Sequence, residues 1–182
     1  MDSKVIKITA ARPRAKTYYE RWMEKEAVPI VEGFGVTDVR NIALKHWKRL
    51  GCDGAYLQLR GLEGITGVYI GKMPPGGMLY PERHLYEKVI YIIEGQGVVE
   101  IQQRDRVPQN IQWQTGSLFS PPLNSLHRLI NHSNEPAIFL AVTTAPMALD
   151  HYHNEQFVFN SDFSFNDRYD GETNYFEPGN ER

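Results

Sequence analysis

Glu82 and His84 stand two residues apart in a segment, residues 76–97, that begins and ends in glycine-containing turns. A carboxylate and an imidazole are side chains that bind metal ions and exchange protons near neutral pH. In an extended chain, side chains two residues apart point to the same side. The pair therefore predicts one shared site for metal binding or acid–base chemistry.

The residues around this pair have the pattern of β-strands. Short apolar or alternating stretches recur along the chain, separated by glycine, proline and polar residues. This spacing, without helical patterns in between, favours a β-sandwich or β-barrel over a parallel sheet with helical crossovers. The predicted strands are residues 55–59, 66–72, 88–94, 98–102, 110–114, 126–130 and 136–144, and Gly116 is predicted to turn the chain into residues 117–121. The turn Gly95-Gln96-Gly97 predicts a hairpin between the third and the fourth of them.

The two ends differ from this middle part. Residues 17–27 predict a helix that ends before Pro29, and residues 41–50 predict a second, short helix. Aromatic residues alternate in the C-terminal part, as at Phe157 and Phe159, which predicts a strand that closes the barrel edge or crosses a neighbouring subunit. We therefore divide the chain into an N-terminal arm and helical lead-in (1–53), a β-barrel (54–146) and a C-terminal strand or extension (147–182).

Composition limits the classes of partner. The chain has 182 residues, of which 41% are hydrophobic, and its formal net charge is −2. A near-neutral chain has no global field that attracts nucleic acid or an anionic membrane, and no apolar run approaches the ~20 residues of a membrane span. We expect neither nucleic acid nor membrane as a partner. Cys52 is the only cysteine, so an internal disulfide is excluded, which fits a cytoplasmic location.

Two segments together resemble the motifs of the cupin superfamily. The first motif is G-x5-H-x-H-x3,4-E-x6-G; Gly76 and Gly95 match its ends, and its ligand positions fall on Glu82, His84 and Lys88. The second is G-x5-P-x-G-x2-H-x3-N, which the chain matches from Gly116 through Pro122 and His127 to Asn131, with Asn124 in place of its second glycine.

The resemblance covers residues 54–145 and implies an all-β fold. This fold is the double-stranded β-helix, also called the jelly-roll or cupin barrel, here with a short helical N-terminal region. The whole chain also resembles the first half of two-cupin proteins, so its polar C-terminal end could be where a second barrel would begin. Fold by itself does not settle function.

The resemblance implies a metal site formed by His84, His127 and Glu82. Two histidines and one carboxylate are the ligand set of non-haem iron(II) oxygenases, although manganese, nickel or zinc would also fit. A cupin of this kind would be a metal-dependent dioxygenase or isomerase. Glu82 and Lys88 are its candidate catalytic residues, because a desolvated lysine can act as a base or as a Schiff-base nucleophile.

Lys88 supports an alternative to the metal site. It stands where the family has a glutamate ligand, and an ammonium group pointing into the barrel would repel a divalent cation. It could instead pair with Glu82 and fill the site without metal. The chain would then be a non-catalytic cupin that binds a ligand or mediates dimerisation through a degenerate, metal-free site.

Pocket lining and partners follow from the same barrel. By strand alternation, Ile90 and Ile92 face the same way as Lys88, and Leu129 the same way as His127. Such an apolar lining suits a small organic molecule.

Because single cupin barrels commonly pair through sheet edges, we also expect a homodimer. A second set of ligand-type residues at strand spacing, His151, His153 and Glu155, lies past the motifs and is predicted to be surface residues.

Overall fold

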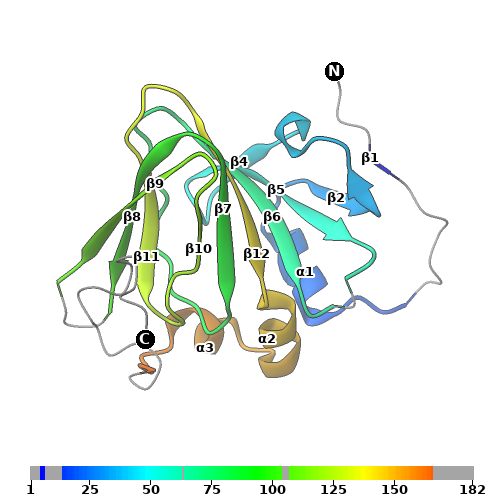
Figure 1. Cartoon of the computed structure of the whole chain (residues 1–182). Coiled ribbons are helices and arrows are strands. Elements are labelled where there is room, and N and C mark those ends of the chain that lie inside the picture. The colour runs from blue at the N-terminus through cyan, green and yellow to red at the C-terminus, as the bar shows by residue number, and fades with distance from the viewer. Residues whose placement is uncertain (1–4, 7–13, 63, 104–106, 166–182) are drawn as a thin grey trace, which may run out of the picture.

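The structure, a computed structural model, describes residues 5–6, 14–62, 64–103 and 107–165 (Figure 1). Strands dominate, and three short α-helices lie at the two ends of the described chain. In chain order the elements are β1 (Val5–Ile6), α1 (Tyr18–Lys25), β2 (Ile30–Gly33), β3 (Gly35–Val36), a 3-10 turn (Val39–Asn41), β4 (Lys45–Trp47), β5 (Cys52–Leu59), β6 (Gly67–Met73), β7 (Lys88–Glu94), β8 (Gln96–Gln102), β9 (Gln109–Gln114), β10 (Leu118–Phe119), β11 (Leu126–Asn131), β12 (Ala137–Thr143), α2 (Ala145–Tyr152) and α3 (Glu155–Asn160).

Two antiparallel sheets form the body of the molecule. The larger sheet has the strand order β10-β7-β12-β6-β5-β2, with β4 added beside β5, and the smaller sheet has the order β11-β8-β9. Among the described strands, only β2 runs parallel to its neighbour, β5. Figure 1 shows the smaller sheet on one side of the barrel and the larger sheet on the other. The predicted all-β jelly-roll fold is confirmed.

The predicted hairpin at Gly95-Gln96-Gly97 is wrong. β7 pairs with β10 and β12, whereas β8 pairs with β9 and β11. The chain bends at Gly95, which has a φ of 105°, and leaves one sheet for the other. A glycine with positive φ serves a sharp bend between sheets as well as a hairpin turn, so the residue type alone did not distinguish them.

The N-terminal region contains the first predicted helix but not the second. α1 begins after Thr17, whose side chain forms a capping box with Glu20, and this arrangement satisfies free amide groups of the first turn. Residues 41–50 are not helical: the end of a 3-10 turn is followed by β4. β2 and β4, both within residues 1–53, join the larger sheet. The exact division into 1–53, 54–146 and 147–182 stays a prediction.

The prediction of a C-terminal strand is also wrong for the residues that the structure describes. Residues 145–160 form α2 and α3. Asn154 accepts a hydrogen bond from the amide of Phe157 and so caps α3, and the one fully buried residue of α3 is Val158. Residues 166–182, where a second barrel would begin, lie outside the described part of the chain. None of the described helices is long and apolar enough to cross a membrane.

Strand alternation directs side chains into the barrel. On β7 the buried residues are Lys88, Ile90 and Ile92, and on β11 they are His127, Leu129 and Asn131. Ile90, Ile92 and Leu129 are therefore buried on the same side as Lys88 and His127, as strand alternation predicted. The interior contains a polar end, formed by Lys88 and His127, and an apolar body.

Gly97 is predicted to be required for the packing of the smaller sheet. A Cβ there would lie 2.0 Å from the carbonyl oxygen of Ile130 and 2.6 Å from the ring of Trp113. Gly97→Ala should therefore lower the free energy of unfolding by about 1–3 kcal/mol, the range for overpacked interiors, as measured by urea denaturation. Gly35→Ala is the control, because a Cβ there meets nothing within 4 Å. Equal stability of the two variants would contradict this prediction.

Candidate functional site

The loop before β7 brings Glu82 next to His127. The backbone amides of these two residues donate to each other's carbonyl oxygens at 2.9 Å in both directions, which forms an antiparallel bridge on the free edge of β11. His84 follows two residues later, and its carbonyl accepts from the amide of Asn124 at 3.2 Å. Backbone pairing thus places the two motifs against each other at one end of the barrel.

Both histidines have the same tautomer, and both present a lone pair to the site. His84 Nδ1 lies 2.8 Å from the carbonyl oxygen of Tyr86, and His127 Nδ1 lies 3.1 Å from that of Ser125. A carbonyl oxygen only accepts hydrogen bonds, so each Nδ1 carries the proton and each Nε2 is an acceptor. Anchoring of the second ring nitrogen in this way is typical of metal-binding histidines.

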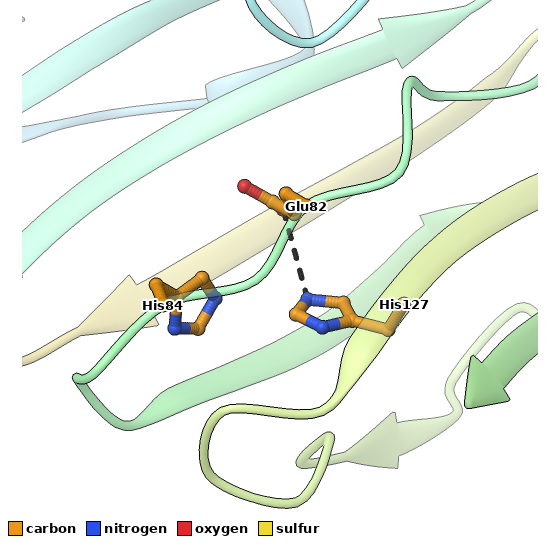
Figure 2. Close-up of side chains that lie close together, drawn as sticks. All are labelled: Glu82, His84 and His127. Carbon is orange, nitrogen blue, oxygen red and sulfur yellow. Dashed lines mark ion pairs between the residues drawn. The ribbon is translucent and has the colours of Figure 1, made fainter. Parts of the chain in front are cut away.

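Glu82, His84 and His127 could hold a metal ion. One ligand atom from each lies within 4.8 Å of the other two, and Figure 2 shows the three side chains converging from the loop and β11. The imidazole rings of His84 and His127 are nearly perpendicular, with centroids 5.1 Å apart. His84 Nε2 is buried and has no hydrogen-bond partner among the described residues. The ligand set predicted from the sequence is therefore assembled in space.

Lys88 lies in the middle of this group. Its Nζ donates to Glu82 Oε1 and lies 3.3 Å from His127 Nε2, and its side chain is 0% exposed. Any ion that contacted both Glu82 Oε1 and His127 Nε2 would have to occupy nearly the same space as this ammonium group. Lys88 and Glu82, the two candidate catalytic residues, are thus paired with each other.

Arg49 donates a hydrogen bond to the other oxygen of Glu82. The sequence did not predict Arg49 as a residue of the site. Its Nη1 lies 3.1 Å from Glu82 Oε2, and its Nε lies 2.7 Å from Glu26 Oε2. The guanidinium group also packs against aromatic rings, with its carbon 5.0–5.7 Å from the ring centroids of Trp22, Trp47 and Phe159. Arg49 belongs to the segment predicted as a helix, and nothing in its sequence neighbourhood indicated contact with Glu82.

The charged groups of Glu26, Arg49, Glu82 and Lys88 alternate in sign. These charges and burial shift the pKa values of the groups in the site. Burial would raise the pKa of Glu82, but Lys88 and the other neighbouring cationic groups lower it overall. Burial lowers the pKa of Lys88, and Glu82 opposes that effect. Burial and the charge of Lys88 lower the pKa of His127 to about 4 and that of His84 well below 6.5. The two imidazoles are therefore neutral at physiological pH.

We expect the neutral histidines to make the protein less stable in mild acid. Their folded-state pKa values lie below the unfolded value near 6.5, so the unfolded chain binds protons first as the pH falls. The contribution of the neutral imidazoles to the free energy of unfolding is therefore fully present above about pH 6.5. It decreases as the pH falls from about 6.5 to 4, by about 3 kcal/mol for His127 alone. Urea denaturation across this range measures the slope.

Two variants isolate this pH effect. His127→Gln should flatten the dependence of the unfolding free energy on pH, because one of the groups that titrate is removed. His46→Gln is the control, since the side chain of His46 is 63% exposed. A slope in His127→Gln equal to that of the wild type would contradict the assignment of this effect to the buried imidazole.

A cleft leads from solvent to Glu82. It encloses about 490 Å³, and its lining includes Arg49, Pro81, Glu82, Arg83, Leu126 and Phe159. The predicted pocket residues Ile90, Ile92 and Leu129 do not line this cleft. They are 0–2% exposed and pack within the main hydrophobic core, so their contact with a ligand stays a prediction.

The second set of ligand-type residues, His151, His153 and Glu155, forms no candidate metal group in the described part of the chain. His151 is exposed on α2, His153 follows α2 and stacks on Tyr18, and Glu155 pairs with Lys25 at 2.9 Å. Cys52 is buried, and burial raises the pKa of its thiol to about 12, which makes it unreactive.

One protein-family profile matches the part of the chain that contains the site. The profile of the cupin domain family matches residues 69–143, a range that contains Glu82, His84, Lys88 and His127. Residues 69–143 form a domain of the cupin superfamily. No curated protein matches the sequence.

Solved structures resemble this cupin in fold. The plu4264 protein from Photorhabdus luminescens is 21% identical, with a TM-score of 0.50, over 62% of this chain and 87% of that one. An oxalate decarboxylase from Lactobacillus farciminis, solved as a formate complex, is 18% identical, with a TM-score of 0.51, over 66% of this chain and 41% of that one. An oxalate oxidase is 17% identical, with a TM-score of 0.42, over 44% of this chain. This cupin spans only about two fifths of the oxalate decarboxylase and oxidase chains. The likeness to the plu4264 protein and to the oxalate decarboxylase shows the fold alone.

Proposed function

We propose that this cupin is a metal-free, small-molecule-binding barrel in which the Lys88 ammonium replaces a metal ion as the central cation. One observation carries the proposal: Lys88 Nζ bonds Glu82 and lies 3.3 Å from His127 Nε2, with no part of its side chain exposed. Two of the three candidate metal ligands are therefore already engaged by a cation that belongs to the chain.

Charge balance supports this proposal. Glu26, Arg49, Glu82 and Lys88 form a chain of alternating charges whose sum is zero. Two unit charges 4 Å apart interact by about 4 kcal/mol at an effective dielectric constant of ~20, and a divalent ion doubles this value. A divalent ion at the site would meet that repulsion from Lys88 and leave a net charge of +2 in a buried space.

The geometry favours binding over chemistry at the Lys88–Glu82 pair. Both oxygens of Glu82 already accept hydrogen bonds from cationic groups, and Lys88 does not reach solvent. Neither group is therefore placed to attack a ligand in the cleft. Glu82 and Arg49 line that cleft directly, so a small organic molecule bound there would rest on the ion-paired network.

A second candidate function, the metal-dependent oxygenase or isomerase, rests on a specific observation. His84 Nε2 is buried without a partner among the described residues, and a metal ion would satisfy it. His84, His127 and Glu82 would hold iron, manganese, nickel or zinc, which when bound supplies a Lewis acid and, for iron, a centre for oxygen activation. Lys88 would first have to leave Glu82, so the structure as folded does not fit this group.

Calorimetric titration of the purified protein tests the proposal. Iron(II), manganese(II), nickel(II) and zinc(II) are each added to protein that was purified without chelators and then dialysed. We expect no saturable heat and no stabilisation in a thermal melt, because Lys88 keeps the ligands engaged. Uptake of one equivalent of any of these metals, abolished by His84→Ala, would overturn the proposal and favour the metal-dependent enzyme.

A further inference from the structure

The cleft above Glu82 contains a second guanidinium group that the ion-paired network does not use. Arg83 lines the cleft beside Glu82, and its side chain is 25% exposed. Its Nε is buried and has no hydrogen-bond partner among the described residues. A buried donor without an acceptor lowers stability. A ligand with a hydrogen-bond acceptor beside Arg83 would therefore supply a partner that the described residues do not.

The acidic groups nearest to Arg83 do not fill this role. Asp162 Oδ1 lies 3.9 Å from Arg83 Nη1, beyond hydrogen-bond distance, on a side chain that is 99% exposed. Such exposed pairs contribute little stability. Glu82, the adjacent residue, has one oxygen bonded to Lys88 and the other to Arg49. The charge of Arg83 is therefore only weakly compensated inside the cleft.

We propose that this cleft binds the carboxylate group of a small organic acid, with Arg83 as its anchor. A guanidinium group presents parallel N–H donors that match a carboxylate in two hydrogen bonds. Pro81, Leu126 and Phe159 also line the cleft and provide apolar surface for the remainder of the molecule. The inference extends the proposed function, because it names the ligand class of the same metal-free site.

Charge favours one carboxylate rather than a dianion or a cation. Glu26, Arg49, Glu82 and Lys88 balance one another, and Asp162, which also lines the cleft, faces Arg83 at 3.9 Å with a side chain that is 99% exposed. A single carboxylate that took the place of the exposed Asp162 beside Arg83 would therefore keep the charges of the cleft balanced. A cationic ligand would meet the guanidinium groups of Arg49 and Arg83, while both oxygens of Glu82 are already bonded to cationic groups.

Benzoate and benzamide are the probes, because they share a shape and differ in charge. Binding is measured by calorimetry, and the arginine Nε–H signals of the labelled wild-type protein are followed by NMR. We expect benzoate, but not benzamide, to bind and to shift the Arg83 signal. Arg83→Gln should weaken benzoate binding by at least about tenfold. Arg128→Gln is the control, since Arg128 is similarly exposed and pairs with Glu100 at 2.8 Å.

Three results would overturn the carboxylate site: equal binding of benzamide, an unmoved Arg83 signal at saturating benzoate, or unchanged affinity in Arg83→Gln. The NMR experiment uses the wild type, so the test does not depend on folding of the variant. Failure of the metal-free proposal is separately visible as metal uptake. A protein that takes up metal and still binds benzoate through Arg83 retains this inference and loses the proposed function.

Discussion

Lys88→Met is expected to lower the free energy of unfolding by about 3–5 kcal/mol, the range for removal of one partner from a buried ion pair. The variant keeps a similar volume but leaves His127 Nε2 and one oxygen of Glu82 without the donor they now have. Arg49 still contacts the other oxygen of Glu82, so we expect the lower part of the range. Urea denaturation followed by tryptophan fluorescence measures the loss.

A double-mutant cycle shows whether this loss comes from the ion pair. Glu82→Gln together with Lys88→Met should lose less stability than the sum of the two single changes, by about 1–3 kcal/mol. Lys72→Met is the control, because Lys72 is exposed on β6 and should have little effect. Additive losses within error would mean that Lys88 and Glu82 do not stabilise each other as the structure indicates.

Lys88→Glu is expected to create a divalent metal site. The change removes the ammonium group and places a second carboxylate beside His84, His127 and Glu82, which restores the residue type found in the cupin motif. Losing a repulsive charge and gaining an attractive one near a divalent ion should raise metal affinity by at least about 100-fold. Calorimetry with manganese(II) and zinc(II) gives the affinity of each variant.

The behaviour of Lys88→Glu also separates three roles for Lys88. If Lys88 replaces the metal, Lys88→Glu gains metal affinity, whereas Lys72→Glu, its exposed control, does not. If Lys88 were a catalytic base or nucleophile, the same variant would lose an activity of the wild type. No gain in metal affinity, in a variant shown to be folded by its thermal melt, would contradict the first role.

The barrel was predictable because its signals are local. Strand alternation and turn glycines gave the strands, and two motifs separated by about 20 residues placed Glu82, His84 and His127 in one site. The Lys88–Glu82 pair also followed from two positions of one motif. The crossing at Gly95 was not predictable, because a hairpin and a bend between sheets need the same positive φ from glycine.

The residues that the two ends of the described chain contribute to the site were not predictable, for a different reason. Arg49 contacts Glu82 from 33 residues away in sequence, and Phe159 reaches the cleft from a helix at the other end of the described chain. Such contacts depend on how the ends fold over the barrel, and no motif encodes that. Alternating phenylalanines around Val158 suggested a strand, yet the Asn154 cap and burial of Val158 favour a helix.

Elemental analysis of the wild-type protein tests most directly whether Lys88 replaces the metal ion. The protein is produced in medium supplied with iron, manganese, nickel and zinc, and it is purified without chelators or a metal-affinity tag. We expect metal far below one equivalent per chain, and no difference between wild type and the His84→Ala/His127→Ala double variant. About one equivalent of a single metal in the wild type, lost in that double variant, would contradict it.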